Sequence, residues 1–118
     1  MTKKISKNVQ KALRQFAGIA YERELSVAAQ ALQTEFSRWT SGAVDVFTLN
    51  EKIHEFHQGI SRELYSRYTV MDAAFAVASA LRRSVLTRTE IGEPVYLSVE
   101  GIVLSLASLQ KHAEGPDA

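Results

Sequence analysis

Residues 48–68, TLNEKIHEFHQGISRELYSRY, decide how this chain is expected to fold. Apolar residues recur in this segment at spacings of three and four, which place side chains on one face of an α-helix. They are Leu49, Ile53, Phe56, Ile60 and Leu64. Thr48 and Glu51 form the T-x-x-E pattern of a capping box, in which each side chain bonds to the backbone N–H of the other. The segment therefore predicts an amphipathic helix that begins at Thr48 and is buried along its apolar face.

A second stripe of polar and aromatic side chains runs beside the apolar one. Its members are Asn50, His54, His57, Ser61, Tyr65 and Tyr68. Such a stripe is expected at a boundary between helices, where it could contact a partner. The candidates for an interaction surface are therefore His54, His57, Arg62, Tyr65 and Tyr68, with Trp39 from the preceding segment. For His57 the plainer interpretation, which we prefer, is packing against a neighbouring helix with one hydrogen bond.

Glu51, His54 and His57 lie within two turns of this helix and have side chains that can bind a divalent metal ion. Glu51 and His54 form E-x-x-H, the pair that binds metal inside ferritin-like helical bundles. The sequence contains no second E-x-x-H, and Glu51 is already assigned to the capping box. A weak metal site at these three residues is therefore the least favoured interpretation, and no cofactor is expected.

The sequence gives no argument for an enzyme. It has no glycine-rich phosphate loop, no G-x-S-x-G elbow and no H-E-x-x-H zinc motif. The absence of cysteine excludes disulfides, thiolate zinc sites and a cysteine nucleophile. Ser61 follows His57 by four residues, but no acid or oxyanion hole completes a catalytic group around them. We expect no catalytic residues.

Helical periodicity extends over the rest of the chain. No proline interrupts residues 6–39, and two offset apolar stripes there predict one long helix, straight or bent at Gly18. Ser6 is the expected N-cap, and Gly42 is expected to end the helix. The long helix spans roughly 50 Å, whereas the helix from Thr48 spans only about 30 Å.

Two further helices are expected. Residues 71–86 are rich in small side chains and predict a buried helix capped by Thr69 or Asp72. A last helix follows a loop at residues 87–94 and begins at Pro94 or is capped by Ser98. The fold class is thus all-α, a long N-terminal helix with three shorter helices packed as an antiparallel bundle. We expect a single domain over residues 1–111 and a disordered tail over residues 112–118.

The length of the first helix suggests a homodimer. Either later helices stack end to end along it, or a second subunit covers the excess. We favour the homodimer because most soluble oligomers are symmetric homo-oligomers. The alternative is that the basic first turns of the long helix fray in solvent. The aromatic residues Phe16, Phe36 and Trp39 are expected to be buried, either in the dimer or in the core of one chain.

Charge is unevenly distributed although the formal net charge is only +1. The first 14 residues contain no acid and carry Lys3, Lys4, Lys7, Lys11 and Arg14. This basic end could contact phosphate, so a nucleic-acid-associated regulatory protein is the alternative function. A solvated helix face is the plainer interpretation of the same residues. The last helix is too apolar to serve as a recognition helix.

The sequence also predicts where the protein is found. No stretch approaches the roughly 18 apolar residues of a membrane span. The basic N-terminal residues are not followed by the apolar segment of a secretory signal. We therefore expect no membrane association and a cytoplasmic location, which the absence of cysteine fits.

The segment IHEFHQGISRELYSRY, residues 53–68, resembles a segment of small uncharacterised bacterial helical proteins. In those proteins a long charged helix precedes it, as residues 11–39 do here, so the resemblance covers the first two thirds of the chain. It implies a bacterial cytoplasmic protein and draws attention to His54, His57, Arg62, Glu63 and Tyr68, without any catalytic or ligand role. The expected function is a non-enzymatic protein–protein interaction module that self-associates.

Overall fold

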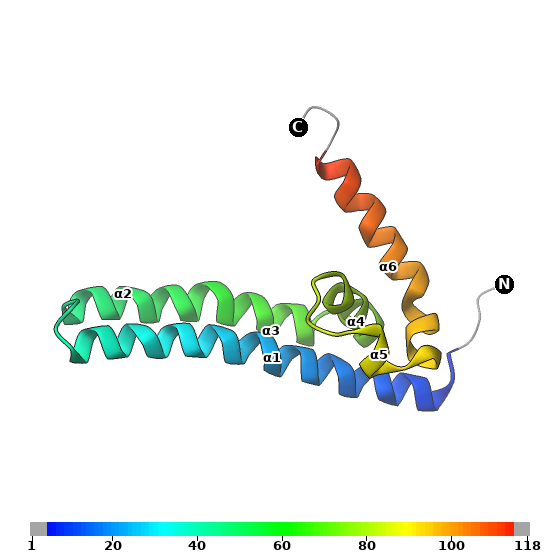
Figure 1. Ribbon diagram of the computed structural model, residues 1–118, viewed down its shortest axis with the longest axis horizontal. Helices are drawn as coiled ribbons and strands as arrows, with labels where there is room; N and C mark the ends of the chain where they lie inside the picture. The colour runs from blue at the N-terminus through cyan, green and yellow to red at the C-terminus, as the bar shows by residue number, and fades with distance from the viewer. Residues whose placement is uncertain (1–4, 115–118) are drawn as a thin grey trace. The chain divides into compact units, whose positions relative to one another are not determined.

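The computed structural model describes residues 5–114, with side chains described up to residue 109, and helices make up most of this range (Figure 1). The elements are α1 (Lys7–Thr40), α2 (Val46–Phe56), the π-helix η1 (His57–Ser61), α3 (Arg62–Thr69), α4 (Ala73–Arg82), α5 (Arg88–Ile91) and α6 (Glu93–Glu114). The predicted all-α fold with a long N-terminal helix is confirmed, and no strand occurs in the described range.

The chain divides into two compact units that both contain part of α1. One unit takes the chain up to residue 20 together with the chain from residue 71 onward, and the other is the helical hairpin of residues 21–70. The first half of α1 thus belongs with α4, α5 and α6, and its second half with α2, η1 and α3. Later helices therefore accompany α1 along its length, so the unpaired overhang that suggested a homodimer does not exist. The single domain over residues 1–111 stays a prediction.

α1 is a single uninterrupted helix of 34 residues, about 51 Å long. The backbone N–H of Val9 donates to the Ser6 hydroxyl over 3.2 Å, which confirms Ser6 as the N-cap. No break occurs at Gly18, where a Cβ would meet no atom within 4 Å. In the first unit, Leu13, Ala17 and Ala20 are buried. These three residues lie four and three apart and form the inward face of this half of the helix.

The turn after α1 has the hydrogen bonds of a Schellman motif. The Ala43 N–H donates to the Arg38 carbonyl over 2.8 Å, and the Gly42 N–H donates to the Trp39 carbonyl over 3.0 Å. Gly42 has a φ of +83°, a left-handed conformation that glycine adopts without steric cost. The predicted stop at Gly42 is therefore confirmed, and it sends α2 and α3 back antiparallel to the second half of α1 (Figure 1).

The predicted capping box of Thr48 and Glu51 is wrong. α2 begins at Val46, and its N-cap is Asp45, whose carboxylate accepts the backbone N–H of Thr48 over 2.8 Å. Aspartate is a stronger N-cap than threonine, and here it starts the helix earlier, so that Thr48 lies within the first turn. Glu51 is therefore not a capping residue.

The helix predicted over residues 48–68 is also interrupted by the π-helix η1. A π-helix has wider turns than an α-helix, so it changes which side chains face the neighbouring helix. Leu49 and Leu64 are buried as predicted, but Ile60 is exposed, whereas Ser61 is partly buried. The expected apolar stripe thus covers the two ends of the segment and fails within η1.

The first unit has a core built on small side chains. α4 begins at its N-cap Asp72, one of the two caps predicted, and buries Ala76, Val77, Ala78 and Ala80. It packs closely against α6, which buries Val95 and Val99. Small side chains shorten the distance between helix axes, so an alanine-rich helix can contact its neighbour closely. The predicted burial of this helix is confirmed.

The loop predicted over residues 87–94 contains the short helix α5. Thr87 and Glu90 form the capping box of this helix, and Gly92 ends it with a φ of +84°. Arg88 donates to Glu93 over 2.6 and 2.9 Å, and its guanidinium lies 4.0 Å from the centre of the Tyr96 ring. α6 begins at Glu93 and extends to Glu114, beyond the boundary expected at residue 111, while residues 115–118 lie outside the described range.

Gly42 in the turn after α1 and Gly18 within α1 allow a matched test of the turn. Gly42→Ala is expected to destabilise the protein by about 1 kcal/mol, because an L-residue is strained at positive φ. Gly18→Ala is expected to stabilise it by about 0.5–1 kcal/mol, because alanine is the better helix former and its Cβ meets nothing. Urea unfolding followed by circular dichroism measures both. Equal effects of the same sign would contradict the assigned turn.

The cap of α2 predicts a pH dependence. The Thr48 backbone N–H is the main cause that lowers the pKa of the Asp45 carboxyl below its ordinary value of 3.8. A lowered folded-state pKa stabilises the fold above the unfolded-state pKa, and this contribution is lost as the pH falls through the folded-state pKa. The melting temperature of Asp45→Ala should therefore lie furthest below wild type at neutral pH, with the gap narrowing below pH 3.8. Thermal melts at a series of pH values measure the gap, and a constant gap would argue against the charged cap.

Candidate functional site

The helical hairpin of residues 21–70, all of them described, has little core of its own. Only Leu49 and Leu64 are buried within this range. Phe36 and Trp39 are 41% and 40% exposed. The expectation that they are buried in the core of one chain is therefore wrong. The hairpin thus has apolar side chains that nothing in its own unit covers.

A polar cluster joins the two arms of the hairpin. The Glu24 carboxylate of α1 accepts the Tyr68 hydroxyl over 2.5 Å and the Arg67 guanidinium over 3.4 Å, both from α3. Tyr21 and Tyr68 stack with ring centroids 5.1 Å apart and planes 9° from parallel. Arg67 also binds Glu63 over 2.8 Å. The Glu24 side chain is only 16% exposed, so these bonds replace water that the carboxylate has largely lost.

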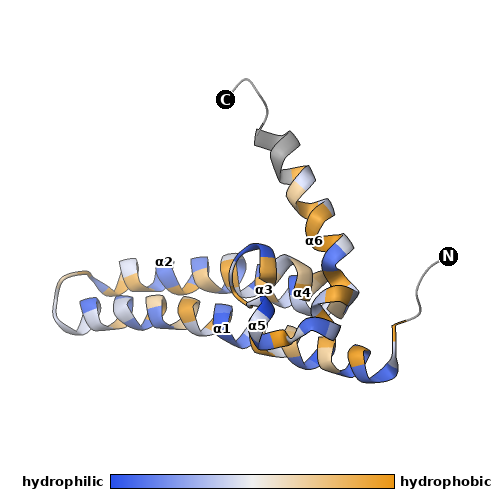
Figure 2. Cartoon of the chain, turned by 45° about the vertical axis from the view of Figure 1, so that its right-hand side comes forward, coloured by the Kyte–Doolittle hydropathy of each residue, from blue (hydrophilic) through white to orange (hydrophobic). Residues whose placement is uncertain are grey.

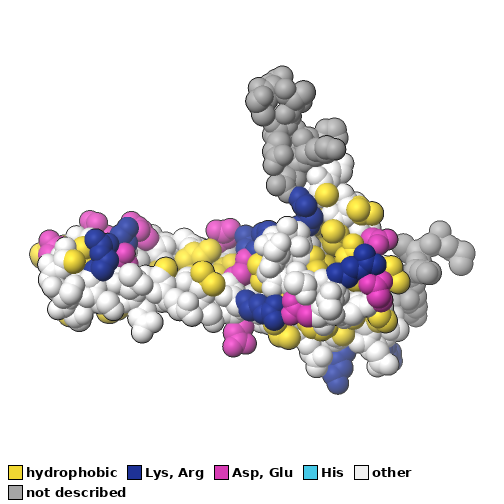
Figure 3. All heavy atoms as spheres, viewed as in Figure 1, with side chains coloured by type: hydrophobic (Ala, Val, Ile, Leu, Met, Phe, Trp, Pro, Cys, Tyr) yellow, Lys and Arg dark blue, Asp and Glu magenta, His cyan; other side chains and the backbone are white. Residues whose placement is uncertain are grey.

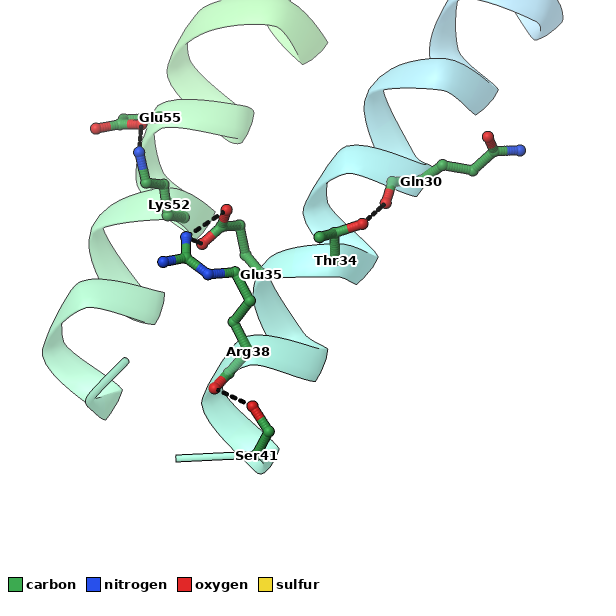
Figure 4. Close-up of polar contacts among 7 residues, drawn as sticks. All are labelled: Gln30, Thr34, Glu35, Arg38, Ser41, Lys52 and Glu55. Atoms are coloured by element: carbon green, nitrogen blue, oxygen red, sulfur yellow. Dashed lines mark hydrogen bonds and ion pairs between the residues drawn. The ribbon is translucent and has the colours of Figure 1, made fainter. Parts of the chain in front are cut away.

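One flank of the hairpin is polar. Arg38 pairs with Glu35 over 3.2 Å on α1, and Lys52 pairs with Glu55 over 3.4 Å on α2. Figure 4 shows the Arg38 guanidinium and the Glu35 carboxylate extending from α1 toward the α2 arm, while the Lys52 amine points to Glu55 on its own helix. Figure 3 shows basic and acidic side chains gathered at the turn end of the hairpin. Pairs this exposed contribute little to stability, so this flank is a solvated surface.

The other flank is apolar. On α1 this flank is formed by Leu25, Ala29, Leu32 and Phe36. On the returning arm it is formed by Val46, Asn50, Ile53 and His57. Both lines have spacings of four, three and four, so each runs straight along its helix. Successive helical residues differ by about 100°, so Phe36 points away from Arg38, and Ile53 lies across the buried Leu49 line from Lys52.

We call these eight residues the apolar flank. Leu25, Leu32 and Ile53 are partly buried, while the other five are exposed. No member is an Asp, Glu, Lys or Arg residue. The spacing of four, three and four in residues 25–36 and again in residues 46–57 is a signal that could have identified this surface from the sequence.

The predicted interaction residues are distributed over more than one surface. His57 belongs to the apolar flank and is exposed, so the expected packing against a neighbouring helix is wrong within this chain. His54, Arg62 and Tyr65 are exposed as well. Tyr68 is partly buried and belongs to the cluster with Glu24, a partner that local spacing in the sequence does not reveal because it lies 44 residues away.

The possible metal site gains no further ligand. No group of three or more His, Asp or Glu side chains that could hold a metal ion occurs in the described part of the chain. Glu51, His54 and His57 therefore do not converge, although Glu51 is released from the capping role assigned to it. Two histidines on one helix do not complete the coordination of a zinc ion.

The basic residues of the alternative function lie on the first three turns of α1. Lys7, Lys11 and Arg14 are exposed, and none has an ion-pair partner among the described residues. Lys3 and Lys4 lie outside the described range. The three described residues are spaced by four and three, so they form one stripe on the helix.

α6 carries a further apolar surface. Leu97, Leu104 and Leu109 are exposed, and Figure 2 shows hydrophobic residues along much of this helix. Among the described helices, none combines the length and the apolar composition that crossing a membrane requires.

A comparison of the chain with protein-family models, curated proteins and solved structures found no match. The resemblance of residues 53–68 to bacterial helical proteins therefore assigns no family.

The polar cluster predicts a specific loss of stability. Tyr68→Phe keeps the ring that stacks on Tyr21 but removes the hydroxyl that Glu24 accepts. The expected cost is about 1–2 kcal/mol, because a hydrogen bond to a charged, largely buried acceptor is lost. Tyr65→Phe removes an exposed hydroxyl nearby and should change the stability by less than about 0.5 kcal/mol. Urea unfolding separates the two, and similar losses would contradict the role of the cluster.

Proposed function

We propose that this chain is a non-enzymatic protein–protein interaction module that forms a homodimer through the apolar flank of its hairpin. One observation carries the proposal. The hairpin buries only Leu49 and Leu64, while a continuous uncharged flank of eight residues stays partly or fully exposed. Exposed contiguous apolar surface on a protein commonly marks an interaction site.

Packing rules favour four helices over two. Two antiparallel helices can bury only the line along which they touch, whereas a four-helix bundle encloses a core between them. A second hairpin laid on the apolar flank would supply the missing two helices. The same contact would cover the apolar flank of the second hairpin, as in an isologous interface with two-fold symmetry.

The chemistry of the flank supports a second copy as the partner. Because the flank contains no fully charged residue, two identical flanks can meet without burying like charges. Asn50 and His57 are its polar members, and they can hydrogen bond across the interface. Polar groups at such positions fix the register of packed helices. The hairpin also carries charges of both signs along its polar flank, so like-charge repulsion between copies is small.

The proposal keeps the setting expected from the sequence. A cysteine-free chain fits the reducing bacterial cytoplasm. The resemblance of residues 53–68 to bacterial helical proteins supports the same setting. Because later helices accompany both halves of α1, the length of this helix does not support the dimer.

Light scattering with matched variants tests the dimer. Wild type should show a dimer mass that falls to the monomer mass on dilution, by mass action. Phe36→Asp should weaken the dimer at least tenfold, because a Phe side chain contributes about 1.5–3 kcal/mol on burial. The control is Val27→Asp, which adds the same charge to α1 at a site 69% exposed. Val27 is 11 residues, about three turns, from Arg38 and so lies on the polar flank.

The control should retain the dimer, and circular dichroism should show that both variants keep their helix content. A wild type that stays monomeric up to about 1 mM, where an association free energy of about −4 kcal/mol would already give half of the chains as dimer, would refute the proposal. Equal weakening by the two variants would show that the apolar flank is not the interface.

A further inference from the structure

The basic stripe on the first turns of α1 has no role in the fold or in the proposed dimer. Lys7, Lys11 and Arg14 are exposed, and the described residues offer them no ion-pair partner. The first acidic residue of the sequence is Glu22, so this part of the helix carries one sign of charge. We infer that the basic stripe binds the phosphate backbone of nucleic acid without selecting its base sequence.

The position of these cations is unfavourable for folding. The N-terminus of a helix carries a partial positive charge, which favours acidic side chains in the first turn and disfavours basic ones. The first turn of α1 has no acidic residue, and it contains Lys7. Lys7 and Lys11 are also like charges at i and i+4, which repel each other. Folding alone therefore does not explain the stripe, whereas a polyanion would neutralise all three side chains and the helix end together.

The opposite face of the helix favours nucleic acid over a membrane surface. A helix that lies on a membrane inserts a free apolar face into the lipid. Here that face is occupied, because Leu13, Ala17 and Ala20 are buried in the core of the first unit. The stripe can therefore act only through charge and hydrogen bonds, which suits a phosphodiester backbone.

The dimensions of the stripe fit a few successive phosphates. Residues 7–14 span about 10 Å of helix, and one strand of DNA rises by 3.4 Å per nucleotide, so the stripe covers about three nucleotides. Asn8 and Gln15 are exposed beside it and can donate to phosphate oxygens. No aromatic side chain lies on this face of residues 7–14 to stack on bases, which agrees with binding to the backbone alone.

Fluorescence anisotropy with a labelled duplex of mixed sequence tests the inference. If three phosphates are neutralised, the affinity should fall about 40-fold between about 50 and 200 mM NaCl, because each contact contributes about −0.9 to the log–log salt slope. The triple variant Lys7→Gln, Lys11→Gln, Arg14→Gln should bind at least tenfold more weakly and lose most of that slope. A second duplex of different sequence should bind equally well.

A charge-matched control separates the stripe from net charge. The triple variant Arg23→Gln, Arg38→Gln, Lys52→Gln removes the same three charges from the hairpin and should bind the duplex as wild type does. The stripe variant should melt no lower than wild type, since it removes cations from a helix N-terminus. Absence of binding at low salt would overturn the inference, and so would equal weakening in the two variants. Binding to anionic phospholipid vesicles without binding to the duplex would overturn it as well.

The experiments can refute the proposed dimer and the proposed phosphate binding independently of each other. Phe36→Asp should convert the dimer to a monomer but leaves the three basic residues in place. Its binding to the duplex should therefore keep the same salt dependence per chain. A monomeric wild type that still binds the duplex would refute the dimer and leave the stripe intact.

Discussion

Each half of α1 has an apolar stripe to bury, and the chain gives the two halves unequal means of doing so. In the first unit, Leu13, Ala17 and Ala20 are buried where small side chains let α4 and α6 pack closely. In the hairpin, the second half of α1 has only the returning arm as a neighbour, and Leu32 and Phe36 stay partly exposed. The difference comes from the number of helices available, because a single contact line covers only part of a helix surface.

Local rules predicted the ends of the helices better than their partners. Ser6, Gly42 and Asp72 act as expected because a cap depends on residues within one turn of it. The T-x-x-E pattern occurs twice, at residues 48–51 and 87–90, and forms a capping box only at the second site. At the first site Asp45 precedes the threonine and captures its N–H. The pattern alone could not choose between two competing caps.

The candidate site was predicted only in part, for physical reasons. His57 was identified in the sequence, but whether another helix covers it depends on the tertiary arrangement, and the structure leaves it exposed. Tyr68 was identified as well, but its partner Glu24 lies 44 residues earlier. That contact exists only because the turn at residues 41–45 brings two distant segments together. The apolar lines on the two arms were visible as spacing, yet their common side follows only from the antiparallel return.

Ionic strength acts in opposite directions on the two surfaces that the chain leaves open. The apolar flank contains no fully charged residue, so salt does not screen its contacts, and excluded salts strengthen burial of apolar surface. The proposed binding of a polyanion by the basic stripe would release counterions, so added salt should weaken it steeply. The two proposed activities also use different residues of α1: residues 25–36 for self-association and residues 7–14 for phosphate binding. One continuous helix can therefore carry an association surface and a phosphate-binding surface whose physical chemistry remains independent.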